Sequence, residues 1–463
     1  MGAARRIVRA RSLAPWIALA LLALVGGTAG WYVWLRTPPL VVGDVEIRPN
    51  APIDPQRTYR LELWEENVVL SGAGTTYRTS LEERVEAFRK SYPNVTVDVE
   101  LFPPGEAADR LQAALASGRP PDIYGSLTPR LYDRTYQVPV ERFLPKPSRE
   151  GMPTFLPSAW HALSAEGHVW GWPRWVRFVT WAGHRGLLAS AGLDVDRAAR
   201  EGWTTPEALS VLSQVGEGRL PGLLVHPTAP DLFQGLMVAA GQGSVLEAGS
   251  LAWTREAMAD AASFLLAARE RARMPRSLDT AARERVTRFA QGRAGAIAPV
   301  PPQLAAHLLR TLSTEGLVLL PPPRPEGAPL QVPGEVSAYL VFRQAPYAGD
   351  GQTRLAMELA RFLIQSKDAW VSAQFPAVPA LTEDLAIWRD EAPWNEAAGQ
   401  ALLGWADAAA YASLDPAEAT VEAQVESQVL APALQELWTS NDAAAWAEKL
   451  RRTLEDQVPE PGG

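Results

Sequence analysis

The stretch from Gly167 to Leu193, GHVWGWPRWVRFVTWAGHRGLLASAGL, carries alternating tryptophans and arginines through its first half. Proline fixes φ and favours an extended residue before it, so Trp172-Pro173 predicts a strand or crossover rather than a helix. A short helix is expected from Gly186 to the glycine stop at Gly192. Flat aromatic faces among guanidinium groups suit a polar, ring-shaped ligand. Any single tryptophan here also suits a core, but the stretch as a whole favours a ligand-lined crossing between domains.

Length, charge and composition bound the class of protein. A chain of 463 residues is too long for one ordinary core and predicts two or three domains. Residues 1–36 hold five arginines and no acid, so the remainder is more acidic than the net charge of −8 suggests. An acidic body offers no basic stripe for nucleic acid. The chain has no cysteine and its five histidines lack metal-ligand spacing, so neither a disulfide, a metal nor a cofactor is expected.

The N-terminus predicts a membrane anchor. Leu13 to Leu35 carries no charge and is long enough to span roughly 30 Å of hydrocarbon as a helix. The basic segment 1–12 favours a cytoplasmic N-terminus, a single membrane pass and a body outside the cytoplasm. A cleaved signal peptide is the alternative, because residues 27–30 are small, but the apolar residues that follow favour an uncleaved helix. Residues 36–56 are rich in proline and are expected to form a tether; residues 459–463 are a short tail.

The first part of the body alternates strand and helix patterns. Ser80 and Glu83 have the spacing of a capping box and predict that a helix begins there. The other expected elements are strands at Tyr59 to Trp64, Asn94 to Leu101 and Pro121 to Gly125, and a helix at Ala107 to Ala116. This βαβαβ order implies a parallel sheet with ligands at the carboxyl edges of its strands.

The later part of the chain is expected to be mostly helical, with a few strands. Trp203 to Glu207 has a cap and a proline that predict the start of a helix through Val215. Further helices are expected at 233–240, 255–271, 283–291, 355–365 and 443–457, and strands at 294–298, 317–320 and 332–342.

Several segments, taken in order, resemble the family 1 extracellular solute-binding proteins of ABC importers, the class that includes the maltose-binding protein. They are LELWEEN and LEERVEAFRKSYPNVTVDVE at 61–100, SGRPPDIYGS at 117–126, GHVWGWPRW at 167–175, TRFAQGRAGAI at 287–297, and LVLLPPPRPEG, GEVSAYLVF and ARFLIQSKDAW in the second half. The resemblance covers residues 57 to 458. The chain departs from the family in lacking the lipid-modified cysteine, which the helix at 13–35 would replace. It also departs at Val179-Thr180-Trp181-Ala182-Gly183-His184, the place where the family has an aromatic-Tyr-Asn sequence.

The resemblance implies an α/β, two-lobe periplasmic-binding-protein-like fold of type II, preceded by one transmembrane helix. One lobe would comprise 57–172 plus 338–378, and the other 173–337 plus 379–458, with hinge closure around a ligand. The expected ligand-binding residues are aromatic stacking faces, arginine donors and a polyol rim: Trp64, Glu66, Tyr77, Tyr124, Ser126, Trp172, Arg174, Trp175, Arg177, Glu335 and Ser337. The alternative for Arg174 and Arg177 is salt bridging to acidic helix residues.

The sequence therefore predicts a monomeric, membrane-anchored extracytoplasmic protein that captures a small polar ligand, a carbohydrate, and delivers it to an ABC permease. A ligand-sensing ectodomain without a transport role is one alternative. A glycoside hydrolase is another, since stacked tryptophans and carboxylates also suit that chemistry. Glu65 and Glu66 are adjacent, however, and would point to opposite faces of a strand. No nucleophile elbow or phosphate-binding loop is present, which disfavours an enzyme.

Overall fold

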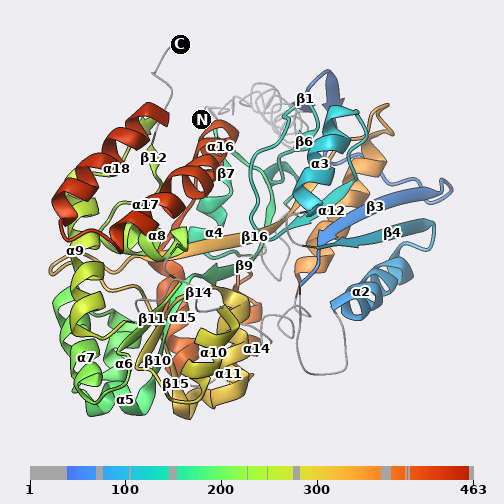
Figure 1. Ribbon diagram of the computed structural model, residues 1–463. Helices are drawn as coiled ribbons and strands as arrows, with labels where there is room; N and C mark the ends of the chain where they lie inside the picture. The colour runs from blue at the N-terminus through green and yellow to red at the C-terminus, as the bar shows by residue number, and fades with distance from the viewer. Residues whose placement is uncertain are drawn as a thin grey trace, which may run out of the picture.

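The computed structural model describes residues 39–68, 77–103, 106–144, 154–226, 228–247, 249–274, 282–365, 377–391, 394 and 397–457. The predicted membrane helix over residues 13–35 and the tail at 459–463 lie outside these ranges. Within them, no helix is both long and apolar enough to cross a membrane. Figure 1 shows two bodies, each with its own sheet and flanking helices.

The larger sheet has the strand order β17-β9-β16-β5-β3-β4, with β6 and β18 also paired to β16. Its strands are β3 (Tyr59–Glu66), β4 (Val95–Phe102), β5 (Ile123–Ser126), β6 (Gln137–Val138), β9 (Trp172–Phe178), β16 (Val332–Phe342), β17 (Ala377–Pro379) and β18 (Ala409–Tyr411). β3 pairs in parallel with both β4 and β5, which confirms the predicted βαβαβ order. β9 and β17 are antiparallel additions that arrive from later in the chain.

The smaller sheet has the order β11-β14-β10-β15. Its strands are β10 (Thr180–His184), β11 (Leu223–Val225), β14 (Ala296–Val300) and β15 (Leu317–Leu320). The central strand β10 is buried almost throughout, as small and apolar residues allow. Trp181 lies inside this lobe, with its ring centroid 5.9 Å from that of Trp203, so this tryptophan of the central stretch belongs to a core.

Helices pack against both sheets. The helices are α2 (Tyr77–Ser91), α3 (Glu106–Ala116), η1 (Glu141–Phe143), α4 (Pro157–Ala162), α5 (Arg185–Ser190), α6 (Val195–Glu201), α7 (Thr205–Glu217), α8 (Pro230–Ala239), α9 (Arg255–Arg271), α10 (Ala282–Ala290), α11 (Pro302–Gly316), α12 (Asp350–Ile364), α14 (Asp384–Asp390), α15 (Ala397–Asp407), α16 (Pro416–Gln424), η2 (Val425–Leu430), α17 (Ala431–Leu437) and α18 (Ala443–Gln457). α12 packs against α2, β3 and β16, whereas α8 packs against β16, β14 and α9. The structure also has two short hairpins, β7–β8 (Ser164–Ala165, His168–Val169) and β12–β13 (Leu246–Glu247, Ser250–Leu251).

The chain passes between the two sheets at Val179, since β9 belongs wholly to the larger sheet and β10 to the smaller. This changeover lies after the boundary at 172/173 that the sequence suggests. The return passage connects β15 to the long strand β16, which runs across the middle of the molecule beside β9 (Figure 1). Two neighbouring strands therefore link the lobes.

Two helix starts were predicted from capping residues, and one of the two predictions is confirmed. Thr204 caps α7 in a capping box with Glu207, as predicted. The box predicted at Ser80 is wrong, because α2 already begins at Tyr77 and Ser80 lies inside it. Tyr77, the first described residue of α2, is buried and held by polar contacts to the strands of the larger lobe (below).

Part of the expected tether is structured. Leu40–Val42 (β1) and Val45–Ile47 (β2) form an antiparallel hairpin, with Leu40, Val42 and Ile47 buried. Asp44 at its turn forms an ion pair of 2.7 Å with Arg343. The apolar residues that alternate here therefore attach this segment to the larger lobe instead of leaving it as a spacer.

Candidate ligand-binding pocket

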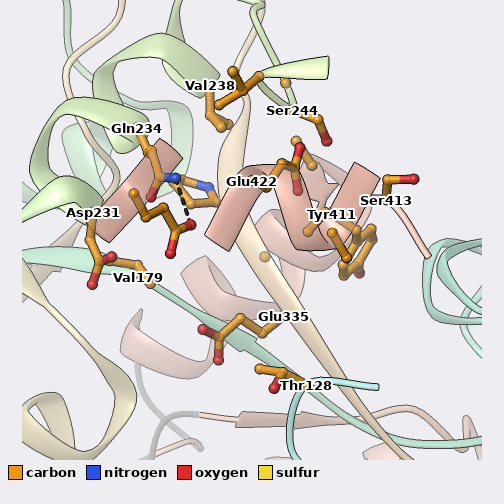
Figure 2. A pocket seen from close by; sticks show the side chains of 18 of the residues that line it. Thr128, Val179, Asp231, Gln234, Val238, Ser244, Glu335, Tyr411, Ser413 and Glu422 are labelled. Atoms are coloured by element: carbon orange, nitrogen blue, oxygen red, sulfur yellow. Dashed lines mark hydrogen bonds between the residues drawn. The ribbon is translucent and has the colours of Figure 1, made fainter. Parts of the chain in front are cut away.

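A cavity of about 390 Å³ lies where the strands pass between the lobes (Figure 2). Its walls come from the loop after β5, the crossover at Val179, the start of β16, α8, and the C-terminal elements β18, α16 and η2. The larger and the smaller lobe both contribute residues. A volume of this size is typical of a pocket for a small organic ligand.

The wall at Tyr411 depends on a glycine. Gly334 on β16 and Tyr411 on β18 are register partners. A Cβ built on Gly334 would lie 2.7 Å from the Cβ of Ala409 and 3.2 Å from the Tyr411 ring. Only glycine therefore lets β18 approach β16 so closely and places the Tyr411 ring against the cavity.

The floor of the pocket carries an ion pair across two strands. Glu335 on β16 and Arg177 on β9 are register partners, and Nη2 of Arg177 lies 2.7 Å from Oε2 of Glu335. The Arg177 side chain is buried, whereas the Glu335 side chain keeps 33% of its surface exposed. Glu335 lines the cavity, so this pair joins the buried sheet to the pocket.

Three carboxylates and one amide line the pocket on its helical side. Asp231 and Gln234 lie on α8, Glu422 on α16 and Glu426 on η2. Gln234 Nε2 donates a hydrogen bond of 2.7 Å to Oε1 of Glu426. Burial raises the pKa of all three acids above the ordinary carboxylate value, and nearby carboxylates raise it further. Figure 2 shows Asp231, Gln234 and Glu422 around the space between the elements.

Only one of the residues expected to bind ligand lines this pocket. Glu335 lines the cavity. The rest lie elsewhere, and most are buried: Glu66, Tyr77, Tyr124, Ser126, Trp172, Arg174, Trp175, Arg177 and Ser337. Trp64 is partly buried and packs edge-on against Phe102, with ring centroids 5.4 Å apart.

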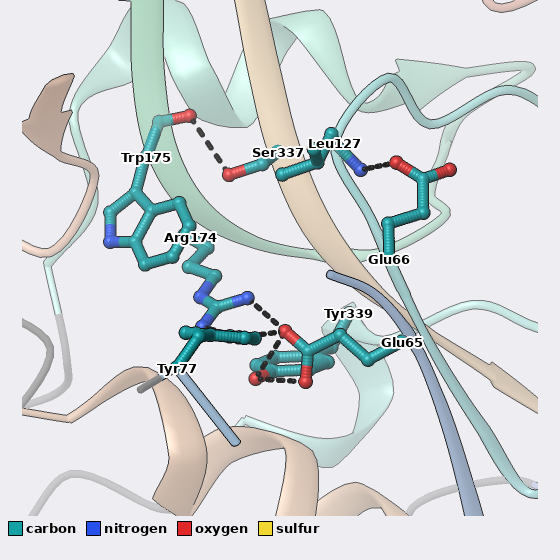
Figure 3. Close-up of polar contacts among 8 residues, drawn as sticks. All are labelled: Glu65, Glu66, Tyr77, Leu127, Arg174, Trp175, Ser337 and Tyr339. Atoms are coloured by element: carbon teal, nitrogen blue, oxygen red, sulfur yellow. Dashed lines mark hydrogen bonds and ion pairs between the residues drawn. The ribbon is translucent and has the colours of Figure 1, made fainter. Parts of the chain in front are cut away.

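Arg174 belongs to a buried polar cluster inside the larger lobe (Figure 3). It forms an ion pair with Glu65 and a hydrogen bond with the Tyr77 hydroxyl. Tyr77 and Tyr339 also donate to the Glu65 carboxylate. The guanidinium carbon lies 3.7 Å from the centroid of the Trp175 ring. Aromatic and arginine side chains that suggest a ligand site thus satisfy one another.

Trp172 and Ser337 are also interior residues. Trp172 has no exposed surface, and its ring centroid is 6.3 Å from that of Phe155. The Ser337 hydroxyl donates to the backbone oxygen of Trp175 at 3.5 Å. These contacts fix β9 and β16 against each other and do not reach the pocket.

A second buried group supports the pocket loop. The Tyr124 hydroxyl donates to Glu66 at 2.7 Å, and Glu66 accepts the backbone N–H of Leu127 at 2.9 Å. Arg177 donates to the backbone oxygen of Leu127 at 2.8 Å. The following residues, 128–130, line the cavity. Glu66, Tyr124 and Arg177 therefore position the loop. Both arginines form ion pairs, as the alternative expected, but their partners Glu65 and Glu335 lie on strands and not on helices.

The sequence analysis missed most of the pocket's lining residues. Gln234 lies in the helix expected at 233–240, and Tyr411, Glu422 and Glu426 lie in the later part that was expected to be mostly helical. Asp231 was assigned to no element, and none of the five was predicted to bind ligand. Glu422 and Glu426 are four apart and share a helix face beside buried Val425. Acidic residues on an otherwise apolar helix face are the sequence feature that could have indicated Glu422 and Glu426. In the described part of the chain, no group of acidic and histidine side chains is arranged to hold a metal ion.

Comparisons with known proteins identify the fold. No family model and no curated protein sequence matches the chain. Among solved structures, the GacH receptor of Streptomyces glaucescens matches with a TM-score of 0.64 at 15% identity, over 87% of this chain and 100% of that one. The maltotriose-binding protein of Thermus thermophilus matches with a TM-score of 0.61 at 15% identity, over 86% and 100%. A family 1 extracellular solute-binding protein from Alicyclobacillus acidocaldarius matches with a TM-score of 0.64 at 16% identity, over 88% and 100%. The chain therefore has the α/β fold of the extracellular solute-binding proteins.

Proposed function

We propose that this protein is an extracytoplasmic solute-binding protein that captures an oligosaccharide in the pocket between its lobes and delivers it to an ABC permease. The observation that carries the proposal is the cavity at the crossover strands, lined from both lobes. A ligand held there would contact both lobes at once and would favour their closed arrangement.

The chemistry of the lining suits a polyhydroxylated ligand. Thr128, Gln234, Ser244 and Ser413 offer hydroxyl and amide groups, and the Tyr411 ring offers an apolar face. A sugar presents hydroxyl groups at its rim and C–H groups on its faces, so it can use both kinds of contact. The matching structures support this class of ligand: the GacH receptor was solved with acarbose, the Thermus protein with maltotriose and a Listeria monocytogenes protein with cycloalternan.

The membrane part of the proposal comes from the sequence. An uncharged helix over residues 13–35, preceded by arginines, would hold the body on the outer face of the membrane beside a permease. Such an anchor would take the place of a lipid-modified cysteine, which this chain lacks.

A ligand screen with a readout of closure tests the function. The full-length protein in detergent is mixed with neutral, basic and acidic oligosaccharides, polyols and peptides, and its melting temperature is measured. A ligand at 100 times its Kd adds about 2.7 kcal/mol to the free energy of unfolding. Small-angle scattering should then show a more compact particle with the same ligand. Absence of any sugar that produces both effects would contradict the proposal.

A further inference from the structure

The pocket is strongly acidic, which bears on the class of sugar it accepts. Of the described residues that line it, one is basic and several are acidic. The basic residue is Arg130, and the acidic residues are Asp231, Glu335, Glu422 and Glu426. The Arg130 guanidinium lies 6.0 Å from the centroid of the Tyr132 ring, and Glu335 already has a guanidinium partner in Arg177.

The remaining carboxylates have no cation beside them in the described part of the chain. Glu426 accepts its hydrogen bond from the neutral amide of Gln234. Glu422 is only 9% exposed, and its Oε1 atom is buried without a hydrogen-bond partner. Asp231 forms neither an ion pair nor a hydrogen bond with another described side chain. Of these three acids Glu422 is buried, Glu426 is half-buried, and Asp231 is exposed at the start of α8. A buried polar atom without a partner is unfavourable, so a cationic ligand that reaches Glu422 would relieve this arrangement.

These acids act on one another across the cavity. Burial is the main cause of the raised pKa of each, and the next cause is repulsion between them. Glu335 raises the pKa of Asp231, Glu426 raises that of Glu422, and Asp231 raises that of Glu426. Neutral hydrogen-bond donors offset part of the rise at Glu422 and Glu426. All three acids line the same cavity.

The spread of the carboxylates favours an organic cation over a metal ion. In the described part of the chain, no three acidic or histidine side chains converge as metal ligands. A sugar with a protonated amine carries hydroxyl groups as well as a positive charge, and these can form hydrogen bonds with Gln234 and Ser244. A metal ion carries only the charge. An acidic sugar would be repelled by the same charges.

We propose, on the basis of the binding function above, that the ligand is a basic oligosaccharide whose protonated amine lies among the carboxylates of Asp231, Glu422 and Glu426. The hydroxyl groups of the sugar would contact the neutral polar groups of the lining, and its ring face would pack on Tyr411. The amine would supply the positive charge that the described part of the pocket lacks.

Calorimetric titration of the full-length protein tests this with one pair of ligands. The probes are short glucosamine oligomers with free amines and the same oligomers with every amine acetylated. They share one backbone and differ in charge. The free-amine oligomer should bind at least tenfold more tightly, and raising the salt concentration should weaken its binding but leave that of the acetylated oligomer unchanged.

Isosteric variants locate the amine. Asp231→Asn and Glu422→Gln should each weaken binding of the free-amine oligomer about tenfold and weaken binding of the acetylated oligomer less. Glu82→Gln, on the exposed face of α2, is the matched control and should change neither affinity. If a pocket variant fails to fold, as judged by its melting temperature, the comparison of the two oligomers with the unmodified protein still decides.

The outcomes separate the two proposals. If acetylated or other neutral oligosaccharides bind as tightly as the free-amine oligomer, the basic-sugar inference is overturned and the binding function stands. If no oligosaccharide of any charge binds, both are overturned. Free-amine binding that Asp231→Asn and Glu422→Gln leave unchanged would also overturn the inference, because the amine would then lie elsewhere.

Discussion

Arg177 and Glu335 are register partners on β9 and β16 and form an ion pair of 2.7 Å, with the arginine buried in the sheet and the glutamate at the pocket. Since Arg177 also holds the backbone of Leu127, one side chain connects the crossover strands, the pocket loop and the pocket floor. The predictions below test the roles of this pair and its neighbours.

Loss of Arg177 should destabilise the protein more than loss of the charge on Glu335. Arg177→Met removes the hydrogen bond to Leu127 and leaves Glu335 without its partner, and we expect a loss of about 2 kcal/mol in the free energy of unfolding. Glu335→Gln should lose less than about 1 kcal/mol, because a third of that side chain is exposed and solvent screens the pair. Urea unfolding followed by tryptophan fluorescence measures both; equal losses would contradict this assignment.

The Glu65–Arg174 pair should be structural, with no direct part in binding. Both residues are buried, and Glu65→Leu would leave Arg174 charged in the interior. Removing one partner of such a pair costs about 3–5 kcal/mol, and removing both in Glu65→Leu/Arg174→Met should restore part of the loss. A folded single variant with unchanged stability but abolished ligand binding would instead return Arg174 to the ligand site.

The pocket wall should depend on Gly334. Gly334→Ala places a methyl group 2.7 Å from the Cβ of Ala409, so β18 and Tyr411 must move, and the affinity for the sugar should fall at least tenfold. Gly243→Ala is the matched control, since it also lines the pocket but its added Cβ meets no atom within 4 Å. Titration calorimetry on both variants checks this, and equal affinities would argue against the pocket.

Asp122 should make stability depend on pH. Burial raises its pKa from 3.8 to about 7, against hydrogen bonds from Glu62 N–H, Gln344 and Gln352. Because the folded pKa lies above the unfolded one, folding takes up a proton between these values. This contribution to stability therefore grows as the pH falls from about 7 towards 3.8, and is lost as the pH rises through 7.

The test for Asp122 is the pH profile of urea unfolding between pH 5 and 8. Asp122→Asn should flatten the profile relative to the unmodified protein, whereas Asp98→Asn, at an exposed site on β4, should leave it as it was. A profile that is identical with and without the Asp122 carboxyl would refute the raised pKa.

Much of the fold could be predicted because its elements carry local signals. The strands at Leu317–Leu320 and Val332–Phe342 are separated by a proline-rich segment, and α9 and α18 have periodic apolar faces; all four occur at the predicted bounds. The central stretch was also predicted as a crossing, since proline at 173 excludes a helix. These features depend on residues near in sequence.

The pocket itself could not be predicted, because its walls meet only in the fold. β17 and β16 pair with β9 at Trp175 and Trp172, so strands from the second half of the chain enclose β9 within the sheet, and both tryptophans are buried. Asp231 and Glu422 lie on helices that are far apart in the sequence, and only the fold brings α8 and α16 to one cavity. Composition and spacing contain no record of such distant contacts.

Hydrogen-exchange mass spectrometry of the full-length protein, with and without its tightest-binding oligosaccharide, shows whether a sugar binds between the lobes at the crossover strands. Slower exchange is expected together at residues 127–130 of the larger lobe, along α8 of the smaller lobe, and over residues 409–426. Protection confined to one lobe, or to a surface away from this cavity, would contradict binding between the lobes.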